Sequence, residues 1–453
     1  MSAKEASTEL HRCLTAWDLT LLGIGAIIGA GIFVLTGIAA ATQAGPAVIF
    51  SYILAGLAAG FSAFAYAELA ASIGGCGSAY GYAFVGLGQF AAWVIGWDLL
   101  LEYGTNVATI CIGWSGYVQN ILSAFGFTLP HQLTNDPFDG GIVNLPAVII
   151  ILLLAKVLSA GMKESSKFNN VMVYVKLAII GFFIVLGGMH FNAVNWHPFV
   201  PFGFQGVVNG ASLIFFAYIG FDAVSTAGDE TINPNRSLPI GIIASLVICT
   251  LIYVIFAAVL TGLVHYSTLN NSAPVATALF QTGHPLAAEI ISLGAIAGLT
   301  TTILAMYYGL TRVYVAMSRD HLLPKKIAAI NPRTRTPQRL IWAMAILVSF
   351  MAGFVPITQM ASLVNIGTLA AFIAVSASVI ILRYTKPDMP RPFKTPFSPL
   401  IPTLGIVMCC YLMYSLPRTA WMGFWIWTLT GLVIYFSYSR LVAKKIRRTL
   451  LAI

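Results

Sequence analysis

The sequence predicts an all-α polytopic membrane protein, because its composition is strongly apolar and its apolar runs have the length of membrane spans. Of its 453 residues, 58% are hydrophobic and 9% are charged. The mean hydropathy is +0.86, far above the range of soluble domains. A membrane span needs about 20 apolar residues. Twelve runs of that kind are present, at about 17–42, 46–73, 88–121, 142–160, 168–190, 206–229, 239–264, 286–318, 339–355, 359–383, 399–416 and 419–441.

The net charge of +9 indicates topology rather than a nucleic-acid partner. With the N-terminus inside, nearly all Lys and Arg residues fall in inner segments, and Arg418 is the exception. The outer loops near 122–141, 191–205 and 265–285 contain none. This bias is the positive-inside rule, so we expect a multi-pass protein of the plasma membrane with both termini in the cytoplasm.

Both ends of the chain are predicted to be short inner segments. Residues 1–16 lack the basic start and cleavage pattern of a signal peptide, so we expect the first span to be retained. Residues 442–453 form a basic tail. The six cysteines lie in spans or on the inner side, so we expect no external disulfide framework.

Four glycines interrupt the first span: Gly23, Gly25, Gly29 and Gly31. In hydrocarbon, backbone groups that leave a helix must face a cavity or a ligand. Glycine costs roughly 1 kcal/mol relative to alanine inside a helix, so the cluster predicts a broken helix whose backbone forms a binding site. The alternative is close helix packing, since Gly25 and Gly29 form a GxxxG pattern.

Span six has a similar interruption, made of Gly220 and Asp222. Interrupted segments at matching places in two halves of a transporter indicate its binding site. Spans one and six each begin a set of five, which fits two halves of opposite orientation, 17–190 and 206–383, followed by two more spans within 399–441. Alternatively, Asp222 only caps the half-helix that begins there.

Several polar residues within spans are candidates for a role in function. Lys176 lies eight residues beyond Phe168, roughly 12 Å into span five at the helical rise. A lysine at that depth is a functional candidate, unless it snorkels back to the inner surface. Glu102 in span three has no assigned partner and is a structural or gating candidate. The threonines at 300–302 in span eight are further candidates. Alternatively, their hydroxyls only bond to carbonyls of their own helix, as is common in membrane helices.

Motifs of other chemistries are missing from the sequence. It contains no P-loop, no GxGxxG after a strand, no HExxH and no GxSxG. Most of its seven histidines lie near the outer side, too scattered for a metal site. We therefore expect a protein that is not an enzyme and that uses no cofactor and no metal.

The residues resemble the amino acid–polyamine–organocation (APC) transporters, and within them the bacterial members of the cationic amino acid transporter family. The resemblance covers essentially all twelve spans. Its motifs are Gly-Ala-Ile-Ile-Gly-Ala-Gly-Ile-Phe at 25–33, Tyr66-Ala67-Glu68-Leu69, Gly77-Ser78-Ala79-Tyr80, Leu101-Glu102-Tyr103, Val175-Lys176-Leu177, residues 215–222, and Ala316-Met317-Ser318-Arg319-Asp320.

The resemblance implies a five-plus-five inverted-repeat fold, in which spans one, two, six and seven form a bundle that rocks against a scaffold. It also implies a substrate site made of backbone. The carboxylate of an amino acid would meet N–H groups of Ala30 and Gly31, with Gly29 allowing a close approach. Its ammonium would meet freed carbonyls of both breaks, those of Ile27, Phe216, Ala217 and Ile219. Helix N-termini suit a carboxylate, and unwound carbonyls suit a cation.

Lys176 matches a lysine that, in proton-coupled relatives, replaces a sodium ion of sodium-coupled ones. When protonated, it is expected to donate to span-one carbonyls near Gly25 and to Thr301 or Thr302, and so to bridge bundle and scaffold. Met306, one turn beyond Thr302 on the same face, is expected to limit the size of the substrate side chain. The alternative is that Met306 only fills a gap in the core.

Two departures from the family pattern limit the transfer. Many relatives have a proline where this chain has Gly74 and Gly75, which puts the rigidity of that inner loop in question. Animal members have two further spans, so a preference for cationic substrates does not follow from the family name. Because no acid is placed to meet a second ammonium, small neutral amino acids are expected to bind better than arginine or lysine.

The sequence therefore favours a proton-coupled symporter of amino acids, with the lipid bilayer, an amino acid and a proton as its partners. One alternative is an exchanger of amino acids or polyamines without net proton coupling, and another is an importer of cationic amino acids. A channel would need a continuous polar pore, whereas the ionisable residues in the spans are scattered. The exact substrate, the stoichiometry, the oligomeric state and any accessory membrane subunit are not assigned by the sequence.

Overall fold

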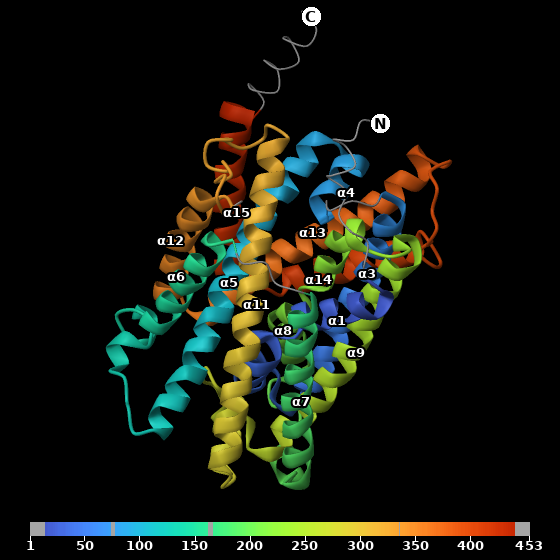
Figure 1. Ribbon diagram of the computed structural model, residues 1–453. Coiled ribbons are helices and arrows are strands. Elements are labelled where there is room, and N and C mark those ends of the chain that lie inside the picture. The colour runs from blue at the N-terminus through green and yellow to red at the C-terminus, as the bar shows by residue number, and fades with distance from the viewer. Residues whose placement is uncertain (1–13, 74–77, 162–165, 335, 440–453) are drawn as a thin grey trace, which may run out of the picture.

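The computed structural model describes residues 14–73, 78–161, 166–334 and 336–439, and Figure 1 shows its helices. Most of the predicted N-terminal segment, Gly74, Gly75 and Gly77 of the inner loop, and the basic tail lie outside the described residues. In the described part, every named element is a helix, and Leu14 and Thr231 form an isolated parallel β-bridge. The prediction of an all-α polytopic fold is therefore confirmed.

The helices of the first half correspond to predicted spans one to five. They are α1 (Ala16–Ile27), η1 (Gly31–Leu35), α2 (Thr36–Ala39), η2 (Ala40–Ala44), η3 (Gly45–Ala47), α3 (Val48–Ile73), α4 (Ser78–Leu87), α5 (Gln89–Ala124), η4 (His131–Leu133), η5 (Pro137–Asp139), α6 (Leu145–Ser159) and α7 (Ser166–Met189). Span one is thus divided, and α5 is the long helix expected for span three.

The second half corresponds to spans six to ten, and two more helices follow it. Its elements are η6 (Ala193–Trp196), α8 (Gly203–Ile214), η7 (Phe215–Tyr218), η8 (Phe221–Glu230), α9 (Pro234–Leu263), η9 (Tyr266–Leu269), α10 (Pro274–Gln281), α11 (Pro285–Arg319), α12 (Gln338–Phe354) and α13 (Ile357–Thr385). The last elements are α14 (Leu400–Tyr414), α15 (Arg418–Ile434) and η10 (Tyr435–Ser439).

Many of these segments are long and apolar enough to cross a bilayer. Within the described residues, seven helical segments of at least 18 residues meet that condition. Four shorter apolar helices also coincide with predicted spans: α1, α6, α12 and α14. The chain is therefore a multi-pass membrane protein. Its orientation, and its division into the halves 17–190 and 206–383, stay predictions.

Two helices lie between the predicted spans. The first is α4, which begins at Ser78 and ends at Leu87. Gly88 follows it, and its φ of +89°, which favours glycine, separates α4 from α5. In the loop 265–285, the helix α10 begins at Pro274, a favoured residue for a first helical position. α10 packs on α11 and on η1, because one of its faces is apolar and buried.

The helices pack in two groups, and the divided helices belong to the first. In the first group, from spans one, two, six and seven, α9 contacts α1 and α3, and α3 contacts α8. α5, α6, α11 and α12, from spans three, four, eight and nine, form the second group, in which α11 runs the length of the molecule (Figure 1). We call these groups the bundle and the scaffold. α7 lies between them and contacts α11, α1 and α9.

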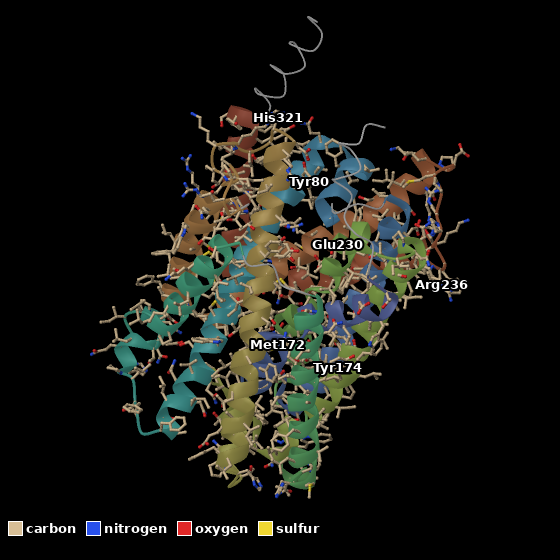
Figure 2. The ribbon with its side chains drawn as sticks, in the orientation of Figure 1. Tyr80, Met172, Tyr174, Glu230, Arg236 and His321 are labelled. Atoms are coloured by element: carbon tan, nitrogen blue, oxygen red, sulfur yellow. The ribbon has the colours of Figure 1, made fainter. Side chains whose placement is uncertain are left out.

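Two side-chain hydrogen bonds join elements that are far apart in the sequence. Tyr80 on α4 and His321, just after α11, lie at the same end in Figure 2. There the hydroxyl of Tyr80 donates to Asp320 Oδ2 (2.6 Å). At the start of α1, Trp17 Nε1 donates to the hydroxyl of Tyr174 on α7 (3.3 Å). The first turn of α1 is thereby held against α7.

Candidate functional site

The break in span one follows a well-capped half-helix. At the start of α1, Thr15 Oγ1 accepts from the N–H of Asp18 (3.3 Å), and Asp18 Oδ2 accepts from the N–H of Thr15 (3.0 Å), which is a capping box. α1 ends at Ile27, and Ile28 is extended with ψ 101°. A second helical segment, η1, begins at Gly31.

The glycines of span one serve both of the expected purposes. A Cβ at Gly25 would lie 2.7 Å from Val173 Cγ2, so this glycine permits close packing of α1 on α7. Gly29 lies in the break itself, where a Cβ would contact Thr302 Cγ2 at 3.4 Å. Close packing and helix interruption are thus successive features of the same motif rather than alternatives.

The break in span six lies against the break in span one. After η7, Ile219 is extended, and Gly220 has a φ of +124° that favours glycine. A Cβ at Gly220 would lie 2.7 Å from the carbonyl carbon of Ala26. A Cβ at Gly31 would overlap Cα and Cβ of Ala217. The two breaks are therefore in van der Waals contact at both glycines.

Divided helices present unpaired backbone groups. The first N–H groups and last C=O groups of a helix have no intrahelical partner, and here η1 begins beside the point where α1 ends. The N–H groups near Ala30 and Gly31 carry a partial positive charge, and the carbonyls near Ile27 a partial negative one. Such a site can hold an anion and a cation a few ångströms apart.

Lys176 lies at this break, with its side chain 2% exposed. Its Nζ donates to the carbonyls of Gly25 (2.9 Å) and Ile28 (3.0 Å) and to Thr302 Oγ1 (2.8 Å). The side chain passes over Gly298, where a Cβ would lie 3.1 Å from Lys176 Cγ. The lysine therefore points into the protein and does not snorkel to the surface. Through it, α7 and α11 are hydrogen-bonded to the carbonyls at the end of α1.

Thr301 and Met306, also predicted on span eight, have different surroundings. Thr301 Oγ1 donates to the carbonyl of Gly298 in its own helix (2.8 Å), so Thr302 is the threonine that bonds Lys176. Met306 is buried at 4% exposure, one turn after Thr302. In span six, the carbonyl of Phe216 accepts from the N–H of Ile219 (3.2 Å).

The two acidic candidates, Glu102 and Asp222, are not among the hydrogen-bond partners given above for Lys176. Glu102 on α5 is 3% exposed, and its Oε2 has no hydrogen-bond partner among the described residues. Asp222 is buried in the first turn of η8, where an acid is favoured by the helix dipole. Gly220, not Asp222, is the N-cap residue of η8, and the cap has no side-chain hydrogen bond. Asp222 lies two residues after that N-cap, so its interpretation as a cap of the half-helix stays a prediction.

Sequence reasoning missed a group of buried tyrosines beside the breaks. The hydroxyl of Tyr253 on α9 lies 2.9 Å from the carbonyl oxygens of both Ile27 and Ala217. The hydroxyl of Tyr52 on α3 lies 2.5 Å from Thr36 Oγ1 and 3.3 Å from the carbonyl oxygen of Gly31. A hydroxyl within an apolar run is a signal that could have drawn attention to these residues.

Known proteins are similar to this sequence over nearly its whole length. The family model described as amino acid permease matches residues 14–436. The methylthioribose transporter of Bacillus subtilis is 48% identical over 442 residues, which are 97% of this chain and 96% of that protein. The branched-chain amino acid permease BcaP of the same organism is 45% identical over 451 residues, 98% of this chain and 96% of that protein.

More distant similarity extends to animals. Human cationic amino acid transporter 4 is 36% identical over 390 residues, 84% of this chain and 61% of that protein. With the family match across the spans and the divided helices at the centre of the fold, these relatives identify the class of protein. The chain belongs to the amino acid permease family of the APC superfamily and is a membrane transporter, not an enzyme.

Proposed function

We propose that this protein imports small neutral amino acids together with protons, by alternating access across the bacterial inner membrane, with both termini in the cytoplasm. The observation that supports proton coupling most is the environment of Lys176. Its Nζ has three acceptors at 2.8 to 3.0 Å, two of them carbonyls at the end of α1. An ammonium has three N–H donors, so this acceptor set is complementary to the protonated form.

Loss of the proton would weaken the link between the two helix groups. A neutral amine has two N–H donors and one lone pair, so at least one of the three acceptors would lose its donor. Hydrogen bonds to a charged group contribute about 1.5–3 kcal/mol each, so loss of the ammonium charge costs part of that contribution even where the two remaining N–H groups stay on the carbonyls of Gly25 and Ile28. That cost favours a rearrangement of α1 relative to α7 and α11, which is the movement that alternating access requires.

The substrate would be held by backbone at the two breaks. The N–H groups of Ala30 and Gly31, with the close approach allowed by Gly29, would bind the carboxylate. The carbonyls at the breaks would bind the ammonium through lone pairs that their present donors leave unused. In this role we include Ile27, Phe216, Ala217 and Ile219. These contacts involve the part that all amino acids share, so they do not set side-chain preference.

Side-chain preference is assigned to Met306. A thioether offers no charge to a second ammonium, and an unpaired buried cation costs several kcal/mol. Neutral amino acids should therefore bind better than arginine. Among neutral substrates, branched-chain amino acids are the alternative to alanine-sized ones, because BcaP of Bacillus subtilis and BcaP of Lactococcus lactis are 45% and 37% identical to this chain.

Uptake by the purified protein in proteoliposomes tests the proposal. Uptake of alanine, leucine, arginine and methylthioribose is compared under an inward proton gradient, in empty vesicles and in vesicles preloaded with alanine. We expect uptake into empty vesicles, with alanine or leucine the preferred substrate. Uptake that needs preloading and does not depend on the proton gradient would indicate an exchanger. If methylthioribose alone is taken up, the amino acid assignment is wrong.

The coupling residue is tested by Lys176→Met, with Lys156→Met as the matched control. Lys156 is an exposed lysine in the apolar helix α6. We expect the Lys176→Met variant to bind alanine but to lose accumulation against a gradient, and the Lys156→Met variant to behave as the unchanged protein. Retention of accumulation with the same pH dependence in Lys176→Met would show that Lys176 is not the coupling residue.

A further inference from the structure

The hydroxyl of Tyr253 connects the two broken helices. It lies 2.9 Å from the carbonyl oxygen of Ile27, at the end of α1, and 2.9 Å from that of Ala217, in η7. Tyr253 itself is fully buried at 0% exposure. One side chain from span seven thus reaches one carbonyl of each break.

At this point one O–H donor faces two carbonyl acceptors. A phenol has a single O–H proton, so it donates to one of the two carbonyls at a time. Ile27 is the last residue of α1, and its carbonyl has no intrahelical partner. A buried carbonyl left without a donor is costly, and each carbonyl oxygen has two lone pairs, so both carbonyls can accept further donors. An ammonium, with three N–H groups, can donate to both of them.

We infer that Tyr253 is a positioning residue for the substrate ammonium. It holds the carbonyls of Ile27 and Ala217 on either side of its hydroxyl, and it satisfies them only in part. A protonated primary amine in the site completes their hydrogen bonding. This inference rests on the proposed function, since it deepens the account of the ammonium subsite.

Packing keeps Tyr253 in this position. Its ring centroid lies 5.2 Å from that of Tyr52 and 5.6 Å from that of Tyr218. The hydroxyl of Tyr218 donates to the carbonyl of Tyr52 (2.8 Å). These three tyrosines come from α9, α3 and η7, and Tyr52 also reaches Thr36 and the carbonyl of Gly31. All four spans of the bundle therefore contribute to the arrangement, so the carbonyl pair moves as one body.

Contact between the breaks supports the same geometry independently. A Cβ at Gly31 would overlap Cα and Cβ of Ala217, so the backbones of span one and span six touch next to the carbonyls that Tyr253 bonds. With the breaks in contact and the carbonyls tied to one hydroxyl, a small ammonium can reach both carbonyls. A hydroxyl substituent in the same place has one donor and can satisfy only one.

The test is Tyr253→Phe, with Tyr307→Phe as the matched control. The hydroxyl of Tyr307 on α11 is equally buried and donates to the carbonyl of Ile341 on α12 (2.6 Å), away from the breaks. Alanine and lactate, in which a hydroxyl replaces the ammonium, are measured as ligands of each purified variant. Thermal unfolding is measured alongside.

We expect Tyr253→Phe to weaken alanine binding about tenfold, the size of one net hydrogen bond, and to leave lactate within twofold. The ratio of the alanine affinity to the lactate affinity then falls. Tyr307→Phe should lower the unfolding temperature and keep that ratio. Equal losses for both ligands in Tyr253→Phe, or an unchanged alanine affinity, would overturn the inference. Failure of the unchanged protein to bind any α-amino acid would instead refute the proposed function.

Discussion

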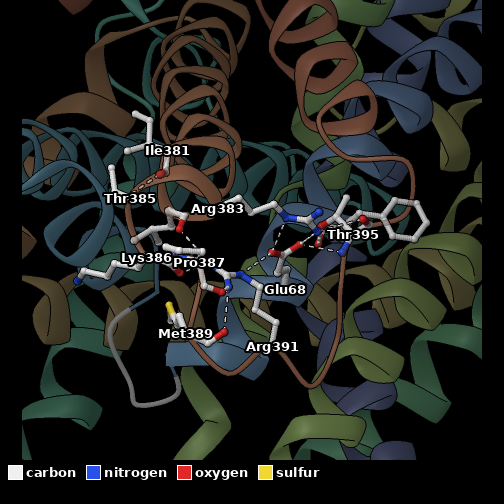
Figure 3. Close-up of polar contacts among 11 residues, drawn as sticks. Glu68, Ile381, Arg383, Thr385, Lys386, Pro387, Met389, Arg391 and Thr395 are labelled. Atoms are coloured by element: carbon white, nitrogen blue, oxygen red, sulfur yellow. Dashed lines mark hydrogen bonds and ion pairs between the residues drawn. The ribbon is translucent and has the colours of Figure 1, made fainter.

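A buried carboxylate at the end of α3 is predicted to stabilise one end of the molecule strongly. Figure 3 shows Glu68 between two arginines. Arg383 Nη2 donates to Glu68 Oε2 (2.7 Å) and its Nε to Oε1 (3.1 Å), while Arg391 Nε lies 3.5 Å from Oε1. The N–H of Thr395 also donates to Oε2 (2.7 Å). The carboxylate thus joins α3 of the bundle to α13 and to the segment that follows α13.

The substitution Glu68→Gln keeps the shape of the side chain and removes its charge. Glu68 is 2% exposed in this ion pair, Arg391 is 9% exposed and Arg383 is 27% exposed. Breaking a buried pair by removing one partner costs about 3–5 kcal/mol. Because water reaches Arg383 and the glutamine oxygen can still accept from Thr395, we expect the lower end, about 3 kcal/mol of unfolding free energy.

The measurement is equilibrium unfolding in detergent at fixed lipid content, with Asp388→Asn as control. Asp388 is an exposed acid in the same segment and has no ion pair among the described residues. We expect Asp388→Asn to change stability by less than about 0.5 kcal/mol. A loss below about 1 kcal/mol for Glu68→Gln would refute the argument, since it would mean that the carboxylate is as well solvated as a surface group.

Two further predictions concern the substrate site. Gly31→Val should abolish alanine binding in a protein that still folds, because even a Cβ there overlaps Ala217. The control Gly181→Val, at an α7 position with no heavy atom within 4 Å, should bind alanine normally. Normal alanine binding by the Gly31→Val variant would place the site elsewhere. Met306→Ser should widen the size profile toward longer side chains in competition assays, since it removes a buried thioether; an unchanged profile would contradict the assignment of selectivity to this residue.

The elements of the fold were predictable because membrane insertion is a requirement on local composition. A membrane span needs about 20 apolar residues so that its helix satisfies the backbone within the bilayer. Each of the twelve apolar runs accordingly contains a helix or, in spans one and six, a divided helix. The breaks were predictable for a related reason: Gly29, Gly31 and Gly220 weaken a helix where an apolar run would otherwise continue it. α10 was not predicted, because its apolar face is short and lies within a polar loop.

The pairing of groups across the site could not be derived in the same way. Tyr253 and Ile27 are 226 residues apart in sequence, and nothing in the apolar run around Tyr253 indicates which carbonyl its hydroxyl reaches. The carbonyl of Ile28 accepts from Lys176. Because every residue carries a backbone carbonyl, the sequence does not indicate which carbonyl takes this role. A site made of backbone is therefore located by its interruptions, but its hydrogen bonds are defined only by the fold.

The two proposed roles at the span-one break involve different partners. Lys176, from outside the bundle, donates to the carbonyls of Gly25 and Ile28, whereas Tyr253, from within the bundle, bonds the carbonyl of Ile27. A phenol keeps its proton at neutral pH, so only the lysine side of the break changes with protonation. Deprotonation of Lys176 would then release the bundle from α7 and α11 while the carbonyls of the two breaks stay together. Under the proposed mechanism, the ammonium subsite can therefore move with the bundle as an intact unit.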